Sequence, residues 1–73
     1  MEDVKLGIYM HYKGNYYRVW FVARHSETKE ELVVYEALRD HSFWARPKKM
    51  FLEEVDVEGK RVPRFKYVGE KHD

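Results

Sequence analysis

Hydrophobic and polar residues alternate over much of the chain, and the longest alternating run, residues 16–25, is rich in aromatic side chains. Alternation of this kind predicts β-strands, in which successive side chains point to opposite faces. A shorter run covers residues 7–12, and Gly14 lies between the two runs, where a tight turn favours a residue that accepts positive φ. We therefore predict a β-hairpin formed by residues 7–12 and 16–25.

The two faces of the second predicted strand differ in polarity. The more apolar face, which we place toward the core, consists of Tyr17, Val19, Phe21, Ala23 and His25. The opposite face is only partly polar, because Trp20 and Val22 alternate there with arginines. Either another part of the chain covers that face or it binds a partner.

Residues 30–39 allow two interpretations. Thr28 and Glu31 have the spacing of a capping box, and several good helix formers follow them, which favours a helix. Val33, Val34 and Tyr35 are stiff or β-favouring residues in the middle of the segment. We favour a strand over residues 32–38 and keep the helix as the alternative.

The remaining sequence predicts further short strands. Residues 43–46 form a strand that ends at Pro47, because proline donates no hydrogen bond to a sheet. Residues 47–51 form one helical or 3₁₀ turn, since proline suits the first helical position. Residues 53–57 and 61–68 predict a last hairpin, whose loop is either the two residues Glu58 and Gly59 or a four-residue segment. About five short strands separated by turns indicate a small antiparallel barrel.

Motifs along most of the chain resemble those of a known family of small bacterial proteins, the domain-of-unknown-function family 1653. These motifs are Gly7-x-Tyr9-x-His11-Tyr12-Lys13-Gly14, Tyr17-Arg18-Val19, Ala23-Arg24-His25-Ser26-Glu27-Thr28, Val34-Tyr35, Trp44-x-Arg46-Pro47, Met50-Phe51 and Pro63-Arg64-Phe65. The resemblance covers roughly residues 6–68. It implies a compact, β-rich, SH3-like domain, and it implies no activity and no functional residues.

Pattern and resemblance together predict a mainly β protein, a small antiparallel, SH3-like β-barrel of about five strands with one short helical or 3₁₀ turn. We expect a single domain over residues 1–73. Within it, residues 1–6 are a loose N-terminal arm and residues 69–73 are a polar tail.

Composition narrows the classes of function. The chain has 73 residues and no cysteine, which excludes disulfides and thiolate zinc sites. A formal net charge of +1 is too small for a strong nucleic-acid footprint. No apolar run approaches the roughly 20 residues that span a bilayer, and the acidic start lacks the apolar segment of a signal peptide. We therefore expect a cytoplasmic protein with no membrane partner.

The histidines and their neighbours do not predict catalysis or a metal. His11, His25 and His41 are too widely spaced for a short metal-binding motif. His25, Ser26 and Glu27 include the residue types of a hydrolase triad, but consecutive residues of an extended chain point to alternate faces. We expect Ser26, Glu27 and Thr28 to organise a turn, and His25 to be buried and hydrogen-bonded or part of a binding surface. We predict no catalytic residue, no metal and no cofactor.

A basic patch with interleaved aromatic residues is a candidate for binding single-stranded nucleic acid. The basic residues are Arg46, Lys48, Lys49, Lys60, Arg61, Arg64 and Lys66. Glu53, Glu54, Asp56 and Glu58 lie in the same half of the chain and would neutralise these cations across a hairpin. We therefore expect nucleic-acid binding to be weak or absent.

Arg46 is the strongest binding candidate, because an arginine beside a tryptophan can stack and still offer hydrogen-bond donors to a carboxylate or phosphate. Its alternative role is an ion pair with Glu53 or Glu54. The predicted binding surface consists of His25, Tyr35, Trp44 and Arg46. We predict a non-enzymatic module that recognises a protein or peptide segment, with a nucleic-acid-binding barrel as the alternative and the oligomeric state left open.

Overall fold

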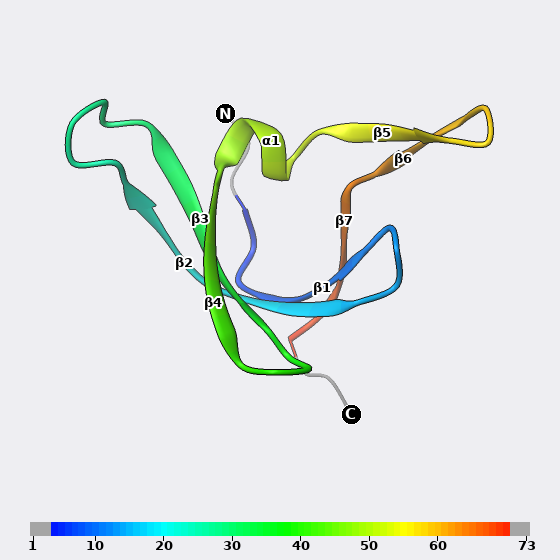
Figure 1. Cartoon of the computed structure of the whole chain (residues 1–73), viewed down its shortest axis with the longest axis horizontal. Coiled ribbons are helices and arrows are strands. Elements are labelled where there is room, and N and C mark those ends of the chain that lie inside the picture. Colours follow the sequence, from blue (N-terminus) through cyan, green and yellow to red (C-terminus); the bar gives the residue numbers. More distant parts are fainter. Residues whose placement is uncertain (1–3, 71–73) are drawn as a thin grey trace.

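The computed structural model describes residues 4–70, which form mainly β structure with one short helix (Figure 1). The elements are β1 (Gly7–His11), β2 (Tyr16–Arg24), β3 (Glu31–Ala37), β4 (Ser42–Pro47), α1 (Lys48–Phe51), β5 (Glu54–Val57), β6 (Lys60–Pro63) and β7 (Phe65–Gly69). The mainly β prediction and the helical turn after Pro47 are confirmed, and residues 31–37 are strand rather than helix. Among residues 4–70 no helix has the length and apolar character that crossing a bilayer requires.

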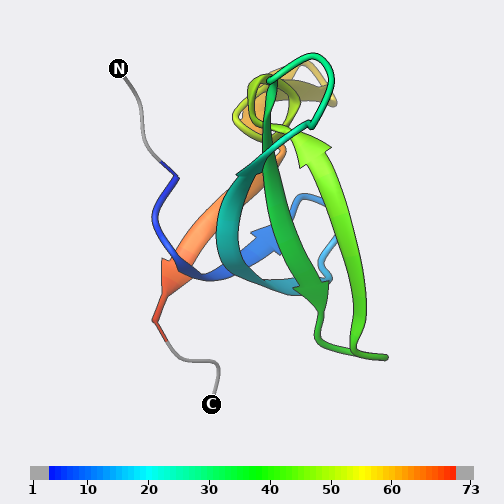
Figure 2. The ribbon, with the colours of Figure 1, turned by 90° about the vertical axis from the view of Figure 1, so that its left-hand side faces the viewer.

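Five strands form one antiparallel sheet in the order β4-β3-β2-β1-β7, and β5 and β6 form a separate hairpin. In Figure 1, β4 and β7 stand on opposite sides of β1 and β2, so that the sheet curves into a trough. The view in Figure 2, turned by 90°, shows β2, β3 and β4 as one wall of this trough. Because β4 and β7 are the two edges and do not pair with each other, the described strands do not close into a barrel.

The hydrophobic core lies inside the trough. Its buried cluster consists of Val4, Tyr9, Val19, Val33, Tyr35, Phe51 and Phe65. Phe51 from α1 stacks on Phe65 from β7 with ring centroids 4.3 Å apart, so the short helix covers one end of the core. Val4 is 9% exposed and belongs to this cluster, and residues 1–3 of the predicted arm lie outside the described residues. Gly69 ends β7, and residues 71–73 of the predicted tail lie outside the described residues.

A β-bulge in β2 reverses the faces predicted for the second half of this strand, while Tyr17 and Val19 lie on the core side as predicted. Val19 pairs with Tyr35 and Phe21 pairs with Val34, so Trp20 is an extra residue between the two pairs. Beyond the bulge Phe21 lies on the outer face and is 55% exposed. The predicted inward placement of Phe21, Ala23 and His25 was therefore wrong, because one inserted residue reverses all later positions.

The C-terminal part of the chain forms three strands where a simple hairpin was predicted. The β5–β6 loop is the two-residue alternative, because Val55 pairs with Val62. Its residues Glu58 and Gly59 both have positive φ, 51° and 82°, as a type I′ turn requires. The strand predicted over residues 61–68 is divided at Arg64, and the second part, β7, leaves the hairpin to pair with β1.

Candidate binding site

Aromatic rings from four strands meet on the concave face of the sheet. Tyr17, Tyr35 and Phe65 lie 5.4 to 5.6 Å apart in pairs, measured between ring centroids, and the pairs are edge-to-face. His11 pairs with Phe65 across β1 and β7, and the centroids of their rings are 4.9 Å apart. Edge-to-face contacts of this kind favour one arrangement of the rings, so the cluster is a firm aromatic floor.

Arg46 lies over this floor. It pairs with Val33, and Trp44 pairs with Tyr35, so both side chains project from β4 onto the concave face, as alternation predicted. The guanidinium carbon of Arg46 is 5.8 Å from the centre of the Phe65 ring, and its Nε donates a long hydrogen bond of 3.4 Å to the Tyr35 hydroxyl. The cation thus stacks on the aromatic floor.

Among the described residues, no carboxylate oxygen lies within 4.0 Å of an Arg46 nitrogen, so Arg46 forms no salt bridge with them. The ion pair predicted as its alternative role does not form, because Glu53 lies 3.4 Å from Arg64 and Glu54 lies 3.7 Å from Arg61. Arg46 is therefore a half-buried cation whose charge is not matched by a neighbouring carboxylate of the described chain.

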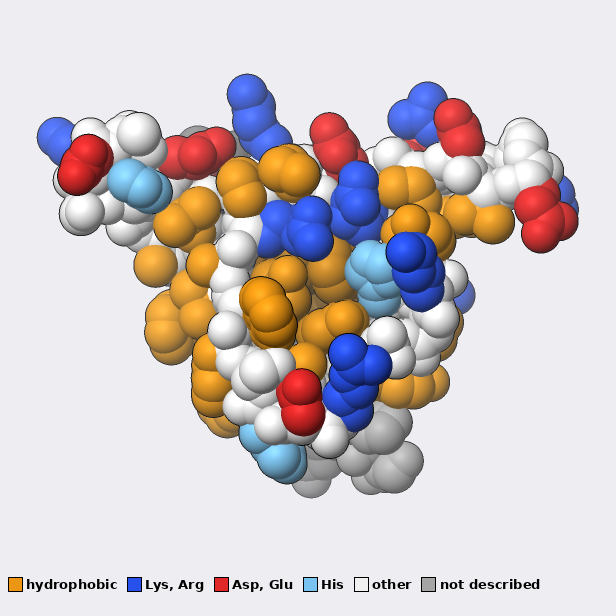
Figure 3. Space-filling view, in the orientation of Figure 1, with side chains coloured by type: hydrophobic (Ala, Val, Ile, Leu, Met, Phe, Trp, Pro, Cys, Tyr) orange, Lys and Arg blue, Asp and Glu red, His pale blue; other side chains and the backbone are white. Residues whose placement is uncertain are grey.

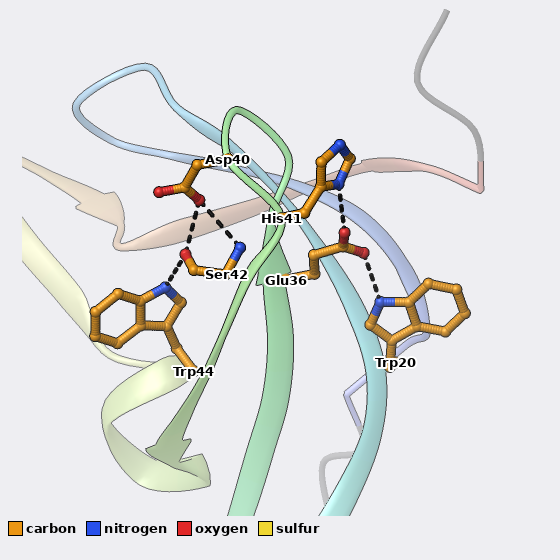
Figure 4. A network of polar contacts seen from close by, with 6 residues as sticks. All are labelled: Trp20, Glu36, Asp40, His41, Ser42 and Trp44. Atoms are coloured by element: carbon orange, nitrogen blue, oxygen red, sulfur yellow. Dashed lines mark hydrogen bonds and ion pairs between the residues drawn. The ribbon is translucent and has the colours of Figure 1, made fainter.

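Trp44 is 56% exposed and yet held in place (Figure 4). Its indole Nε1 donates a 2.7 Å hydrogen bond to the Ser42 hydroxyl, and that hydroxyl donates a 2.7 Å bond to Asp40. The Ser42 backbone N–H donates to the same Asp40 oxygen at 3.1 Å. The chain of bonds fixes a large apolar surface beside Arg46.

Arg64 is a second cation near enough to His11 to affect it electrostatically. Its backbone N–H donates to Glu53 and its carbonyl accepts from Tyr12, both at 3.0 Å, which fixes the residue at the junction of β6 and β7. Its Nη2 lies 3.4 Å from Glu53, and its buried Nε has no hydrogen-bond partner among the described residues. In contrast to Arg46, the charge of Arg64 is thus matched by a carboxylate.

The pKa of His11 is lowered in part by these cations. Burial lowers the pKa of His11 below its ordinary value of 6.5, and the positive charges of Arg46, Arg64 and Lys13 lower this pKa further. The Nδ1 of His11 accepts a 3.2 Å hydrogen bond from the Lys13 backbone N–H. Figure 3 shows hydrophobic side chains in a hollow at the centre of this face, with Lys, Arg and His side chains above and beside it and one acidic side chain below it. The hollow is both apolar and positively charged.

His25 is the one predicted site residue that does not join Tyr35, Trp44 and Arg46. It lies in the exposed turn between β2 and β3, where its Nδ1 accepts hydrogen bonds from the backbone N–H groups of Glu27 and Thr28, at 3.1 and 3.3 Å. The Thr28 hydroxyl accepts from the Glu30 N–H at 3.2 Å, as the predicted turn role of this segment requires. The predicted burial of His25 is wrong.

Sequence reasoning did not place His11, Tyr17, Arg64 and Phe65 at this surface. The available signal was parity, because His11 and Tyr9 are two residues apart in β1 and alternate side chains share one face of a strand. The contact with Phe65 depends on the pairing of β1 with β7, which are far apart in the sequence. No local pattern specifies that pairing.

The outer face carries a separate polar network (Figure 4). Glu36 accepts a 2.9 Å hydrogen bond from Trp20 Nε1, and its other oxygen lies 2.6 Å from His41 Nδ1. These two hydrogen bonds lower the pKa of Glu36, and the bond with His41 has the larger effect. Within residues 4–70 no group of three or more His, Asp or Glu side chains is placed to hold a metal ion.

The fold and this surface define a small, mainly β protein with an open, curved sheet and a cationic aromatic hollow. A family model described as "Protein of unknown function (DUF1653)" matches residues 7–67, and the chain belongs to this family. The chain is also similar to the crystal structure of a protein belonging to DUF1653 from Bordetella bronchiseptica, with 36% identity and a TM-score of 0.89. That match covers 97% of this chain and 95% of the other. No curated protein matches the chain.

Proposed function

We propose that this protein is a non-enzymatic binding module whose concave face holds a protein or peptide segment. The segment contributes a carboxylate to Arg46 and an apolar side chain to the exposed indole of Trp44, which lies beside the buried Tyr35. The observation that supports this proposal is the state of Arg46, a half-buried cation on an aromatic floor with no carboxylate partner among the described residues.

The chemistry of Arg46 suits a carboxylate. A guanidinium that stacks on a ring keeps the N–H groups at its edge available, and these match the two oxygens of a carboxylate. Such charge-assisted hydrogen bonds contribute about 1.5–3 kcal/mol each. Trp44 stands next to Arg46 on the same face, where its fixed indole offers an apolar contact. The two residues together select an acidic group close to an apolar one.

The groups of the hollow are those of recognition rather than catalysis. Arg46, Trp44 and Phe65 provide charge and apolar surface, and none of them is a nucleophile or a base. The Nδ1 of His11 is already occupied by the Lys13 backbone N–H. SH3-like domains hold extended peptides on aromatic surfaces, and an SH3-like relationship stays our prediction for this open, curved sheet. A cytoplasmic location likewise stays a prediction.

Nucleic acid is the second candidate, because an exposed tryptophan beside an arginine also suits an unstacked base. Three of the seven residues of the predicted basic patch, Lys48, Arg61 and Arg64, lie within ion-pair distance of a carboxylate, however. Arg61 lies 3.7 Å from Glu54 and 3.6 Å from Asp56, and Lys48 lies 3.4 Å from Glu31. We therefore rank a peptide first and expect nucleic acid to bind no tighter than about 10⁻⁴–10⁻⁶ M at physiological salt.

Selection from a displayed library of short random peptides tests the proposal. The wild-type protein should enrich sequences that place Asp or Glu close to an aromatic or aliphatic residue, Arg46→Ala should lose that enrichment, and Arg61→Ala should keep it. Arg61 is the matched control because its charge is paired on the β5–β6 hairpin. No enrichment, or the same enrichment with Arg46→Ala, would contradict the proposal. Nanomolar affinity for a single-stranded oligonucleotide at physiological salt would put nucleic acid first.

A further inference from the structure

We infer that the bound segment adds to the sheet as a new strand along the free edge of β4. This inference rests on the proposed function and goes beyond it, because it names the backbone that the segment pairs with and the order of its side chains. The segment would place alternate side chains on the concave face and on the outer face of the sheet.

The edge of β4 is open and regular. β4 pairs with β3 on one side only, and no backbone hydrogen bond joins its other side to the described residues. Its register with β3 runs without a shift from Ser42 to Pro47, so the strand is straight enough to serve as a template. A row of free N–H and C=O groups of this kind can bind an extended peptide.

The other edge of the sheet is protected in ways that β4 is not. The pairing of β7 with β1 contains a register shift between Ile8 and Tyr9, and β7 carries the exposed Lys66 and ends at Gly69. Irregular pairing and exposed lysine are devices that discourage further strand addition. In β4 the guanidinium of Arg46 stacks over the sheet, and proline is confined to Pro47 at the end of the strand. The difference between the edges points to β4.

Two adjacent aromatic residues flank the β4 edge on opposite faces. Trp44 faces the concave side opposite Tyr35 and is 56% exposed, while Phe43 faces the outer side opposite Glu36 and is 61% exposed. A ligand confined to the concave hollow would contact only Trp44. An added strand would contact both, because its successive side chains lie beside Phe43 and Trp44. Strand addition therefore accounts for both exposed rings.

The positive charge of Arg46 indicates that the added strand carries an acidic residue. A second copy of this chain pairing through its own β4 would bring no acidic residue to Arg46, because Ser42–Pro47 contains no Asp or Glu. The occupant is therefore a segment of another protein, β-prone and acidic. It carries a glutamate beside Arg46, an aromatic residue two positions away beside Trp44, and β-branched residues between and after them.

Two capped peptides test this inference by NMR titration of the isotope-labelled protein. The first, acetyl-Thr-Glu-Val-Tyr-Val-Thr-amide, fits an antiparallel strand beside β4, and the second, acetyl-Thr-Val-Tyr-Val-Glu-Thr-amide, fits a parallel one. One of them should bind, with shifts in the β4 amides, and replacing its glutamate by glutamine should weaken binding. Methylation of single backbone nitrogens along that peptide should block binding at every second position only.

The protein variants Phe43→Thr and Phe21→Thr form a matched pair. Both phenylalanines are exposed on the outer face, but Phe21 lies on β2, away from the edge. Phe43→Thr should weaken the peptide about three- to fivefold, the loss of one good cross-strand pair, whereas Phe21→Thr should leave the affinity unchanged.

The possible failures are distinguishable. Binding that Arg46→Ala abolishes but that neither Phe43→Thr nor alternate N-methylation affects would overturn strand addition and leave the proposed function intact. If neither peptide binds at millimolar concentration, strand addition fails, and the proposed function fails as well only if the peptide library gives no enrichment. A peptide-free protein whose mass rises with concentration, and returns to that of a monomer with Phe43→Thr, would make a second copy the occupant and overturn the choice of an acidic segment.

Discussion

The two faces of the β2–β3–β4 wall are both rich in aromatic residues but differ in how their charges are matched. On the outer face Glu36 binds Trp20 and His41, and the guanidinium of Arg18 stacks 5.4 Å from the Trp20 ring. On the concave face Arg46 stacks on Phe65 with no carboxylate nearby among the described residues. Exposed aromatic area alone would favour the outer face. The unmatched charge is the reason that we propose the concave face as the binding surface.

Replacing one phenylalanine by alanine on each face, concave and outer, should give the largest difference, which is a difference in the free energy of unfolding. Phe51 is 1% exposed and stacks on Phe65, so Phe51→Ala should lower the free energy of unfolding by about 3–5 kcal/mol. Phe21→Ala on the outer face should change it by no more than about 0.5 kcal/mol. Chemical denaturation measures both. Similar losses for the two variants would mean that the outer face is buried in the folded protein.

Substitution of Arg46 should separate binding from stability. Arg46→Ala removes no ion pair of the described chain, so the melting temperature should stay within a few degrees of that of the wild type. Peptide binding should weaken about tenfold or more, the equivalent of one charge-assisted hydrogen bond. Arg46→Lys should bind nearly as poorly, because an ammonium group lacks the planar fork.

Melting curves check the fold of these Arg46 variants and titration checks their affinity. A fall in melting temperature of about 10 °C or more would instead assign Arg46 a structural role, because each kcal/mol moves the midpoint of a small domain by roughly 4–8 °C.

The sequence predicted the elements better than the surface they build. β-Favouring residues were enough to predict β3, and alternation was enough for the shared face of Trp44 and Arg46 and for the first hairpin. It failed beyond Trp20, because a bulge changes parity without changing residue type. Alternation could not predict the contact between Phe65 and Arg46, because that contact requires β7 to pair with β1 rather than to continue the β5–β6 hairpin. His25 has the chemistry of a site residue but serves a turn.

Titration of His11 should report the concave charge directly. Arg46 lowers the pKa of His11, so Arg46→Ala should raise that pKa, and a bound carboxylate should raise it in the wild-type protein. Arg61→Ala should leave it unchanged, because Arg61 is not among the charges that act on His11. NMR of the imidazole ring across the pH range measures these values, and an unchanged pKa in Arg46→Ala would place the guanidinium farther from His11.

The lowered pKa of His11 also fixes the sign of a pH effect. The unfolded chain binds a proton at His11 more readily than the folded protein does. This contribution therefore favours the folded state fully above the ordinary pKa of 6.5 and is progressively lost as the pH falls below it. Denaturation series at several pH values should show a shallower decline with His11→Gln than with the wild type between pH 6.5 and the lowered pKa.

Tryptophan emission should give the smallest effect and the most local test of the two faces. A peptide on the concave side contacts Trp44, whereas Trp20 is bonded to Glu36 on the outer face. Binding should therefore change the emission of a Trp20→Phe variant and leave that of Trp44→Phe nearly constant. The reverse result would move the binding surface to the outer face.

The pairing of β1 with β7 also has a kinetic consequence. β2, β3 and β4 each pair with a neighbour in the sequence, but β1 and β7 come from opposite ends of the chain. Closing so long a loop carries the greatest entropy cost in the sheet, so we expect this pairing to form last in folding and to open first. Phe65 arrives beneath Arg46 only with β7. The hollow therefore exists only once the chain has folded completely, and detachment of one terminal strand would erase it while the β2–β3–β4 meander persists.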